Sequence, residues 1–225
     1  ILLKNKYYHL YKYSKEIALD FSKIPVKKTN KIKVGIVGEI YVKYSPLANN
    51  HLEDFLHNED CEVLVPSLMD FVMYSADATI WNHKKYKNKN PLAFLYKIGY
   101  KLMYSMQRKV NHVVKKYTSF EPFHDFEELK KAANKYISEG VVMGEGWLIP
   151  AEMAMLVESG CNNIVSCQPF GCLPNHIVSK GMQRVIKKHY PNANIVAIDY
   201  DPGATKVNQE NRIKLMLAQA KESNE

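Results

Sequence analysis

Residues 161–176 read CNNIVSCQPFGCLPNH and decide the fold. A short apolar run leads into Cys167, a Pro-Phe-Gly triplet then ends any regular structure, and residues 174–189 follow as a helical pattern. The pattern predicts Cys167 near the carboxyl end of a buried strand and Cys172 just before a helix. In an open α/β sheet, the crevice beyond the carboxyl ends of the strands is where ligands bind.

Outward from this stretch, short apolar runs alternate with helical patterns. We predict strands over residues 34–37, 61–66, 163–167 and 194–199, and helices over residues 46–57, 147–158, 174–189 and 205–221. Such alternation is typical of a doubly wound α/β domain with a mostly parallel sheet. It brings one set of strand-end residues to a common edge: Glu39, Glu145, Cys167, Cys172 and Asp201.

The chain divides into an N-terminal helix and linker (residues 1–30) and an α/β domain (residues 31–225). The α/β domain carries a helical insertion at about residues 70–138. No run of about eighteen apolar residues occurs, so we expect no membrane-spanning helix. The first residues do not form a signal peptide, and four cysteines in 225 residues are not a disulfide scaffold. We therefore expect the protein to be located in a reducing cytoplasm. Because the chain lacks an initiator methionine, we also expect it to be a piece of a longer protein.

Positive charge is concentrated in one segment. No acidic residue lies between Asp77 and Glu121, whereas ten lysines and arginines do. Removing these ten from the 31 basic residues leaves 21 against 23 acidic ones, a balance of −2 in a chain whose net charge is +8. Such a segment suits an acidic protein, nucleic acid or a phosphorylated ligand, or it is a solvated helix face.

Residues 91–117 within this segment carry apolar side chains at steps of three and four. This spacing predicts a long amphipathic helix that packs by its stripe from Leu95 to Val113 and leaves its lysines in solvent. The segment has no recognised nucleic-acid motif, and its aromatic residues fall on the apolar face. Nucleic acid is therefore not the expected partner.

Two cysteines are candidate soft-metal or redox ligands, Cys172 and Cys167. A helix N-terminus favours a thiolate at Cys172. Four residues lie between the two cysteines, whereas typically two lie between the paired cysteines of zinc and thioredoxin-type sites. Free cysteines are also often core residues without a further role. The spacing is compatible with a metal or redox site and with two ordinary thiols. We interpret Cys161 and Cys61, which lie near the starts of strands, as structural.

Four strings together resemble the C-terminal region of the large acyl-CoA dehydratase activase-like proteins, over about residues 31–221. The strings are VGEIYVKYSPLANNHLEDFL (residues 37–56), GEGWLIPAEM (144–153), CQPFGCLPNHIVSKGM (167–182) and AIDYDPGATKVNQENRIKLML (197–217). Those proteins resemble a fusion of an ATP-dependent activator with a 2-hydroxyacyl-CoA dehydratase-like part. The resemblance implies an iron–sulfur cluster, of the double-cubane type in a related branch, with one cysteine ligand from a flavodoxin-like C-terminal domain. Cys172 is our first choice for that ligand and Cys167 the second.

The resemblance also implies what else to expect. The crevice candidates that would bond a ligand or the cluster are Glu39, Glu145, Gln168, Asn175, His176 and Asp201. Alternatively, His176 bonds backbone in a first helical turn and Glu145 is a solvated turn carboxylate. A cluster takes about four cysteines and no ATP-binding fingerprint is visible, so the remaining ligands and the activator lie outside this chain.

The expected function is therefore a fragment of an ATP-activated, low-potential iron–sulfur reductase or dehydratase-like enzyme, inactive and cluster-free alone. Its partners would be the activator and other domains of the parent protein, with an acyl-CoA-type small molecule and no membrane. The alternative is a non-catalytic interaction domain that docks an acidic partner through the basic helix of residues 92–117.

Overall fold

The structure is a computed structural model that describes residues 2–27, 29–87 and 91–222, with side chains described from His9 onward. Within these residues, four strands form one all-parallel sheet in the order β2-β1-β3-β4. The strands are β1 (Ile32–Gly38), β2 (Cys61–Leu64), β3 (Asn163–Pro169) and β4 (Asn194–Tyr200). This is an α/β flavodoxin-like fold, as the alternation predicts. No helix among the described residues combines the length and apolarity needed to cross a membrane.

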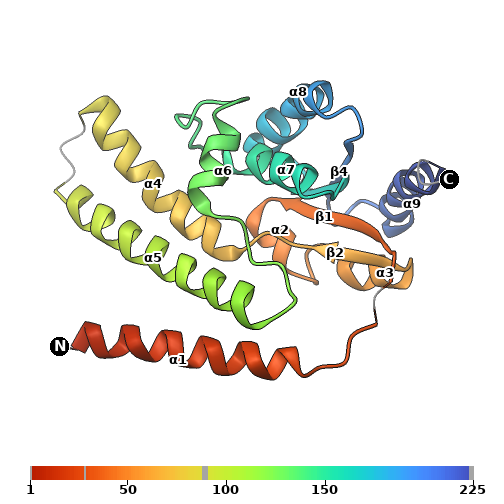
Figure 1. Cartoon of the computed structure of the whole chain (residues 1–225). Coiled ribbons are helices and arrows are strands. Elements are labelled where there is room, and N and C mark those ends of the chain that lie inside the picture. The colour runs from red at the N-terminus through yellow and green to blue at the C-terminus, as the bar shows by residue number, and fades with distance from the viewer. Residues whose placement is uncertain (1, 28, 88–90, 223–225) are drawn as a thin grey trace.

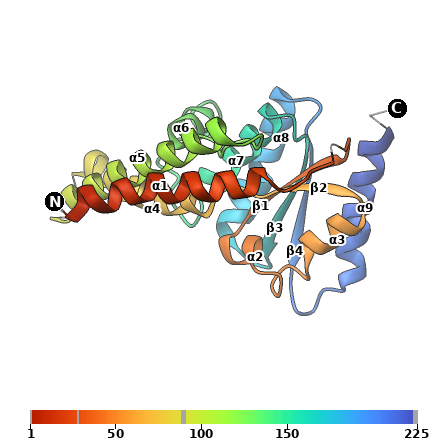
Figure 2. The same cartoon turned by 60° about the horizontal axis from the view of Figure 1, so that its bottom comes forward.

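Helices cover both faces of the sheet (Figures 1 and 2). These helices are α2 (Ile40–Tyr44), α3 (Leu52–Asn58), α7 (Leu148–Glu158), the π-helical turn η1 (Asn175–Lys180), α8 (Gly181–His189) and α9 (Lys206–Glu222). One face packs against α2, α3 and α9 through alternate strand residues such as Val34 and Ile36. The other packs against α7 and α8 through Val37 and Ile164. The sheet is buried on both faces, which explains why its strands read as nearly continuous apolar runs.

The helical insertion packs on the outer side of α7 rather than on the sheet. It contains α4 (Leu68–Tyr86), α5 (Ala93–Tyr117) and α6 (Phe126–Ala133), and its core centres on Trp147, Phe126 and Met73. The N-terminal helix α1 (Leu2–Ser22) lies beside α5, where the Tyr11 and Tyr117 hydroxyls are 3.3 Å apart. Helices α1, α4 and α5 form a layer that projects from the sheet domain (Figures 1 and 2).

The predicted helix over residues 46–57 is confirmed only over its second half, and its first half is a turn. The chain forms the short helix α2, a turn, and then α3, with Asn50 and His51 in the left-handed region at φ 54° and 58°. Asn49 fixes this turn, because its side chain donates to the Val42 carbonyl and accepts from the Leu52 N–H. Local side-chain bonds of this kind compete with a continuous helix.

The predicted packing stripe of α5 is also wrong over its first half. Leu95 is 59% exposed, and Ile98 and Leu102 are exposed as well, whereas Val113 near the helix end is buried. Helices α4 and α6 instead contact the neighbouring side of α5, which carries Tyr100 and Met103. A whole-helix pattern does not show which part of an apolar stripe other elements reach.

Candidate functional site at the carboxyl edge of the sheet

The strand order reverses between β1 and β3, which makes their carboxyl ends the switch point of the sheet. The register pairs Gly38 with Cys167 and Gln168 with Asp199. Gly38 has a φ of +129°, and a Cβ there would lie 1.9 Å from the Cys167 carbonyl oxygen. This close approach brings the loops after β1 and β3 together at one edge.

Glu39 and Glu145 meet at this edge, where both serve the first turn of α2. A Glu39 carboxylate oxygen accepts from the Val42 N–H at 2.8 Å, and Glu145 accepts from the Ile40 N–H at 3.0 Å. The carboxylates thus satisfy amide groups that otherwise have no partner at a helix start. Glu145 is buried, which differs from the solvated turn carboxylate weighed as its alternative.

Cys172 lies at the start of the helical segment that follows β3, and its side chain is partly exposed. Asn175 is fully buried and its Nδ2 donates to the Cys172 sulfur at 3.1 Å. His176 places Nδ1 2.9 Å from the Cys172 carbonyl oxygen, so it bonds backbone, as its alternative interpretation stated. The helix passes here through the π-helical turn η1, a geometry that is frequent at functional sites.

Gln168 and His176, both expected at this edge, belong to a polar cluster whose other members, Asp199 and Lys180, the sequence pattern does not indicate. Gln168 donates to the carboxylate of Asp199, and the Lys180 ammonium lies 3.0 Å from the same group. His176 Nε2 is 3.8 Å from it. Burial raises the pKa of Asp199, but the bonds from Gln168 and Lys180 outweigh burial and hold that pKa below its ordinary value. The cluster depends on the register of β3 and β4, which pairs a strand-end glutamine with a strand-end aspartate.

Cys167 is not exposed at this edge. Its side chain is fully buried in the core beside Val165 and Tyr200, and burial raises the pKa of its thiol to about 12. Cys61 and Cys161 are buried as well. Asp201 follows β4 at the same edge as Cys172, but its carboxylate accepts from the Gly203 N–H in a local turn.

Two fully buried acceptors near Cys172, Gln168 Oε1 and Asn175 Oδ1, have no hydrogen-bond partner among the described residues. Buried acceptors of this kind are normally paired with a donor from the protein or from ordered water. Across residues 2–27, 29–87 and 91–222, no three His, Cys, Asp or Glu side chains are placed to hold a metal ion. At this edge Cys172 is the one partly exposed cysteine, and its sulfur accepts an N–H from Asn175, but the described residues do not supply the complete ligand set that a cluster takes.

We expect Cys172 to react first with iodoacetamide in the native chain, because the other three thiols are buried. Mass spectrometry after a short exposure should find one carbamidomethyl group on the peptide that contains Cys172. A Cys172→Ser chain should lose this fast modification. Rapid modification of Cys61, Cys161 or Cys167 in folded protein would contradict the burial described here.

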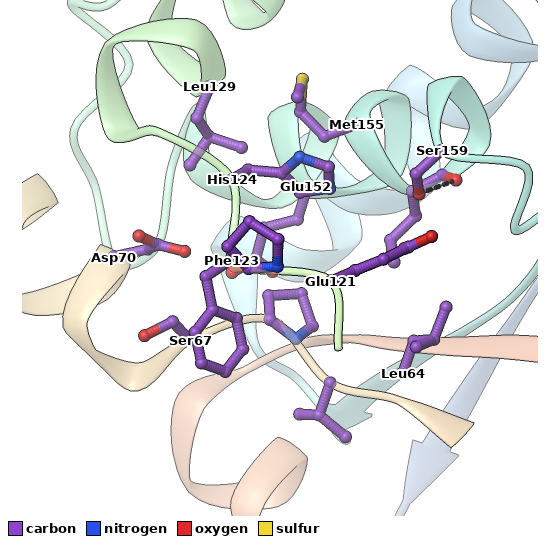
Figure 3. A pocket seen from close by; sticks show the side chains of 14 residues that line it. Leu64, Ser67, Asp70, Glu121, Phe123, His124, Leu129, Glu152, Met155 and Ser159 are labelled. Carbon is purple, nitrogen blue, oxygen red and sulfur yellow. Dashed lines mark hydrogen bonds between the residues drawn. The ribbon is translucent and has the colours of Figure 1, made fainter. Parts of the chain in front are cut away.

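A separate cavity of about 140 Å³ lies where the helical insertion meets the sheet domain (Figure 3). Asp70 from the first turn of α4, Glu121 and His124 from the loop before α6, and Glu152 from α7 contribute its polar groups. Asp70 accepts from Gln107 of α5 at 3.0 Å. Burial, and then the charge of Glu152, raise the pKa of Asp70 to about 7.

The Asp70→Asn variant should be more stable than the native chain at pH 8, by on the order of 2 kcal/mol. Because the folded-state pKa of Asp70 is above its ordinary value of 3.8, the folded chain holds this proton more tightly than the unfolded chain. The contribution of Asp70 to stability therefore falls as pH rises from about 4 through about 7. Asparagine keeps an acceptor for Gln107 and removes the titration.

Urea unfolding at pH 5 and pH 8 measures this effect, and the advantage of Asp70→Asn should shrink toward pH 5. Exposed Glu62 on strand β2, changed to glutamine, is the matched control and should change the free energy of unfolding little and equally at both pH values. An advantage that is equal at both pH values would show that Asp70 does not titrate in this window.

No protein-family model, no curated protein and no solved structure matches this chain.

Proposed function

We propose that this chain supplies one thiolate ligand, Cys172, to an iron–sulfur cluster held between its flavodoxin-like domain and other parts of a longer protein. The observation that carries the proposal is the position of Cys172. It is the one cysteine of the four that is not buried, and it lies at the switch point of the sheet. Ligands bind at this place in open α/β sheets.

The residues around Cys172 suit a sulfur ligand. Asn175 donates an N–H to the sulfur, and donors of this kind tune the potential of iron–sulfur clusters. The contact of His176 with the Cys172 carbonyl fixes the turn that presents the sulfur. Glu39 and Glu145 are engaged at the start of α2, where their charge is offset by helix N–H groups.

The four strings that resemble the acyl-CoA dehydratase activase-like proteins support the same proposal. On that basis, the chain is part of a low-potential reductase or dehydratase-like enzyme that acts on an acyl-CoA-type small molecule. An ATPase activator domain outside this chain supplies the electron. The setting is a reducing cytoplasm, which suits four free thiols.

Iron content of the complete gene product, purified without oxygen, tests the proposal. The Cys172→Ser variant should lose bound iron and sulfide and the visible absorption of the cluster. Cys161→Ser is the matched control, because Cys161 is buried at the opposite end of β3 and should leave both values unchanged.

Two outcomes count against the proposal. If Cys172→Ser retains iron and absorption while Cys167→Ser loses both, the site exists but the ligand is wrong. If both variants retain them, Cys172 is not a metal ligand and the proposal fails.

A further inference from the structure

The first half of α5 exposes an unusual amount of apolar surface. Phe94 is 69% exposed, Ile98 49% and Leu102 42%. These residues are four apart, so they form one stripe along the helix. Leu95 is exposed next to this stripe. Contiguous exposed apolar side chains of this kind mark interaction sites on proteins.

Positive charge follows the same helix on the neighbouring face. Lys97, Lys101 and Arg108 are separated by four and seven residues, which places them on one side of α5. Lys97 and Lys101 lie within one turn of residues of the apolar stripe, whereas Arg108 lies beyond its end. No carboxylate among the described residues forms an ion pair with Lys97 or Lys101. We name this surface the α5 ridge, defined by Phe94, Lys97, Ile98, Lys101 and Leu102.

A basic pocket adjoins the ridge where α4 ends and α5 begins. It encloses about 620 Å³ and is lined by Lys84 and Lys87 from the end of α4 and by Phe94 and Lys97 from α5. Ile80 and Ala93 give it an apolar wall. Such a pocket accepts a large apolar side chain that has carboxylates beside it. Lys89 belongs to the same basic segment of sequence but lies outside the described residues.

We propose that the α5 ridge docks an amphipathic helix of a protein partner, with acidic residues along one edge of the helix's apolar face. The charge on α5 is complementary to that of such a helix. The segment from residue 78 to residue 120 holds ten basic residues and no acidic one, and its charge lies beside exposed apolar side chains. A facing helix can repeat apolar and acidic side chains at the same spacing. This inference does not rest on a cluster at Cys172.

The composition of the ridge favours an acidic helix over nucleic acid. Along the ridge the apolar stripe is continuous, whereas a nucleic-acid groove interleaves aromatic platforms with basic residues. The charged residues of the ridge are lysines, whose ammonium groups are point charges. They lack the planar guanidinium of arginine, which binds phosphate through two hydrogen bonds at once. Apolar area supplies affinity at such a surface, and the lysines supply orientation and association rate.

Binding of three synthetic peptides to the 225-residue chain tests the proposal. The first is a helical peptide of about twenty residues with leucine at i, i+3, i+4 and i+7 and glutamate beside the leucines. The second scrambles its sequence, and the third replaces glutamate by lysine. Titration calorimetry should detect the first peptide alone, with an affinity that falls as salt rises.

Two pairs of substitutions locate the surface. The double variant Lys97→Glu/Lys101→Glu should lower the affinity for the acidic peptide at least about tenfold and remove most of the dependence of that affinity on salt. The matched control, Lys27→Glu with Lys188→Glu, makes the same charge change at exposed lysines outside the ridge and should leave binding nearly unchanged. Ile98→Ser with Leu102→Ser should weaken binding but retain the salt dependence. Circular dichroism verifies that each variant is folded.

Several results would overturn the proposal. If the scrambled peptide bound as tightly as the first peptide, or if the control variant lost as much affinity as Lys97→Glu/Lys101→Glu, net charge alone would explain the binding. Failure of the acidic peptide to bind would remove the helix as occupant. A duplex oligonucleotide that binds more tightly than the peptide and loses affinity in Lys97→Glu/Lys101→Glu would make the ridge a nucleic-acid surface. A dimer in sedimentation that Ile98→Ser/Leu102→Ser dissociates would make the occupant a second copy.

Discussion

Replacing Lys43 by methionine should lower the free energy of unfolding by about 3–5 kcal/mol. The Lys43 ammonium lies 2.9 and 3.1 Å from the two carboxylate oxygens of Glu152, and both side chains are almost fully buried. Burial lowers the pKa of Lys43, but Glu152 outweighs it and holds that pKa above its ordinary value. Without the lysine, a carboxylate would remain buried and unpaired.

The sign of the pH dependence follows from Glu152. Burial raises the pKa of Glu152 even beside Lys43, so in the variant this side chain stays protonated to higher pH. The folded variant then holds a proton that the unfolded chain releases, and its stability should fall as pH rises above the ordinary glutamate range. Urea unfolding at pH 5 and pH 8 measures both the loss and its growth with pH.

Two controls separate this effect from general damage. Lys43→Met with Glu152→Leu removes both charges and should recover much of the loss, because a well-packed apolar pair often replaces a buried ion pair without cost. The exposed pair Lys12–Glu16 is the second control, and Lys12→Met should change stability by less than about 0.5 kcal/mol. A double variant as unstable as Lys43→Met would contradict the role given to the charge.

Gly38→Ala should destabilise the chain by about 4 kcal/mol or more, or prevent folding. The added Cβ would lie 1.9 Å from the Cys167 carbonyl oxygen, which belongs to the backbone of the neighbouring strand and cannot rotate away. The φ of +129° is in addition a conformation almost confined to glycine. Both effects act at the carboxyl ends of the two inner strands, β1 and β3.

Thermal unfolding followed by circular dichroism measures this loss. Gly99→Ala is the control, because Gly99 lies within α5 and an added Cβ there meets no atom within 4 Å. That variant should gain about 0.5–1 kcal/mol from higher helix propensity. A Gly38→Ala chain with native stability would show that the loops after β1 and β3 do not approach as closely as described.

The strands were predictable because a sheet buried on both faces leaves continuous apolar runs between turn residues. The carboxyl-edge location of Glu39, Cys172 and Asp201 followed from that alternation. Helix α4 was not predicted in detail, and the turn at Asn49 was missed because its cause is a pair of side-chain bonds rather than a glycine or proline. Propensity and pattern do not contain such local bonds.

Side-chain roles at the edge were less predictable than positions. Glu39 and Glu145 serve a helix, α2, that the apolar pattern did not indicate. The burial of Cys167 could have been found, because alternate strand residues share a face and Val165 is a core residue. The partnership of Gln168 with Asp199 depends on the register of two strands, which one sequence does not specify.

Helix α1 packs beside a partner that the ribosome makes much later. Tyr11 contacts Tyr117, which is 106 residues further along the chain. At a synthesis rate of about 5–20 residues per second, roughly 5–20 s pass between the synthesis of α1 and that of the end of α5. The sheet is completed later still, because β3, with which β1 pairs, is synthesised after the whole helical insertion. Until then the nascent chain exposes unpaired apolar segments. Its folding during synthesis therefore depends on these segments not aggregating in that time, or on a chaperone that covers them.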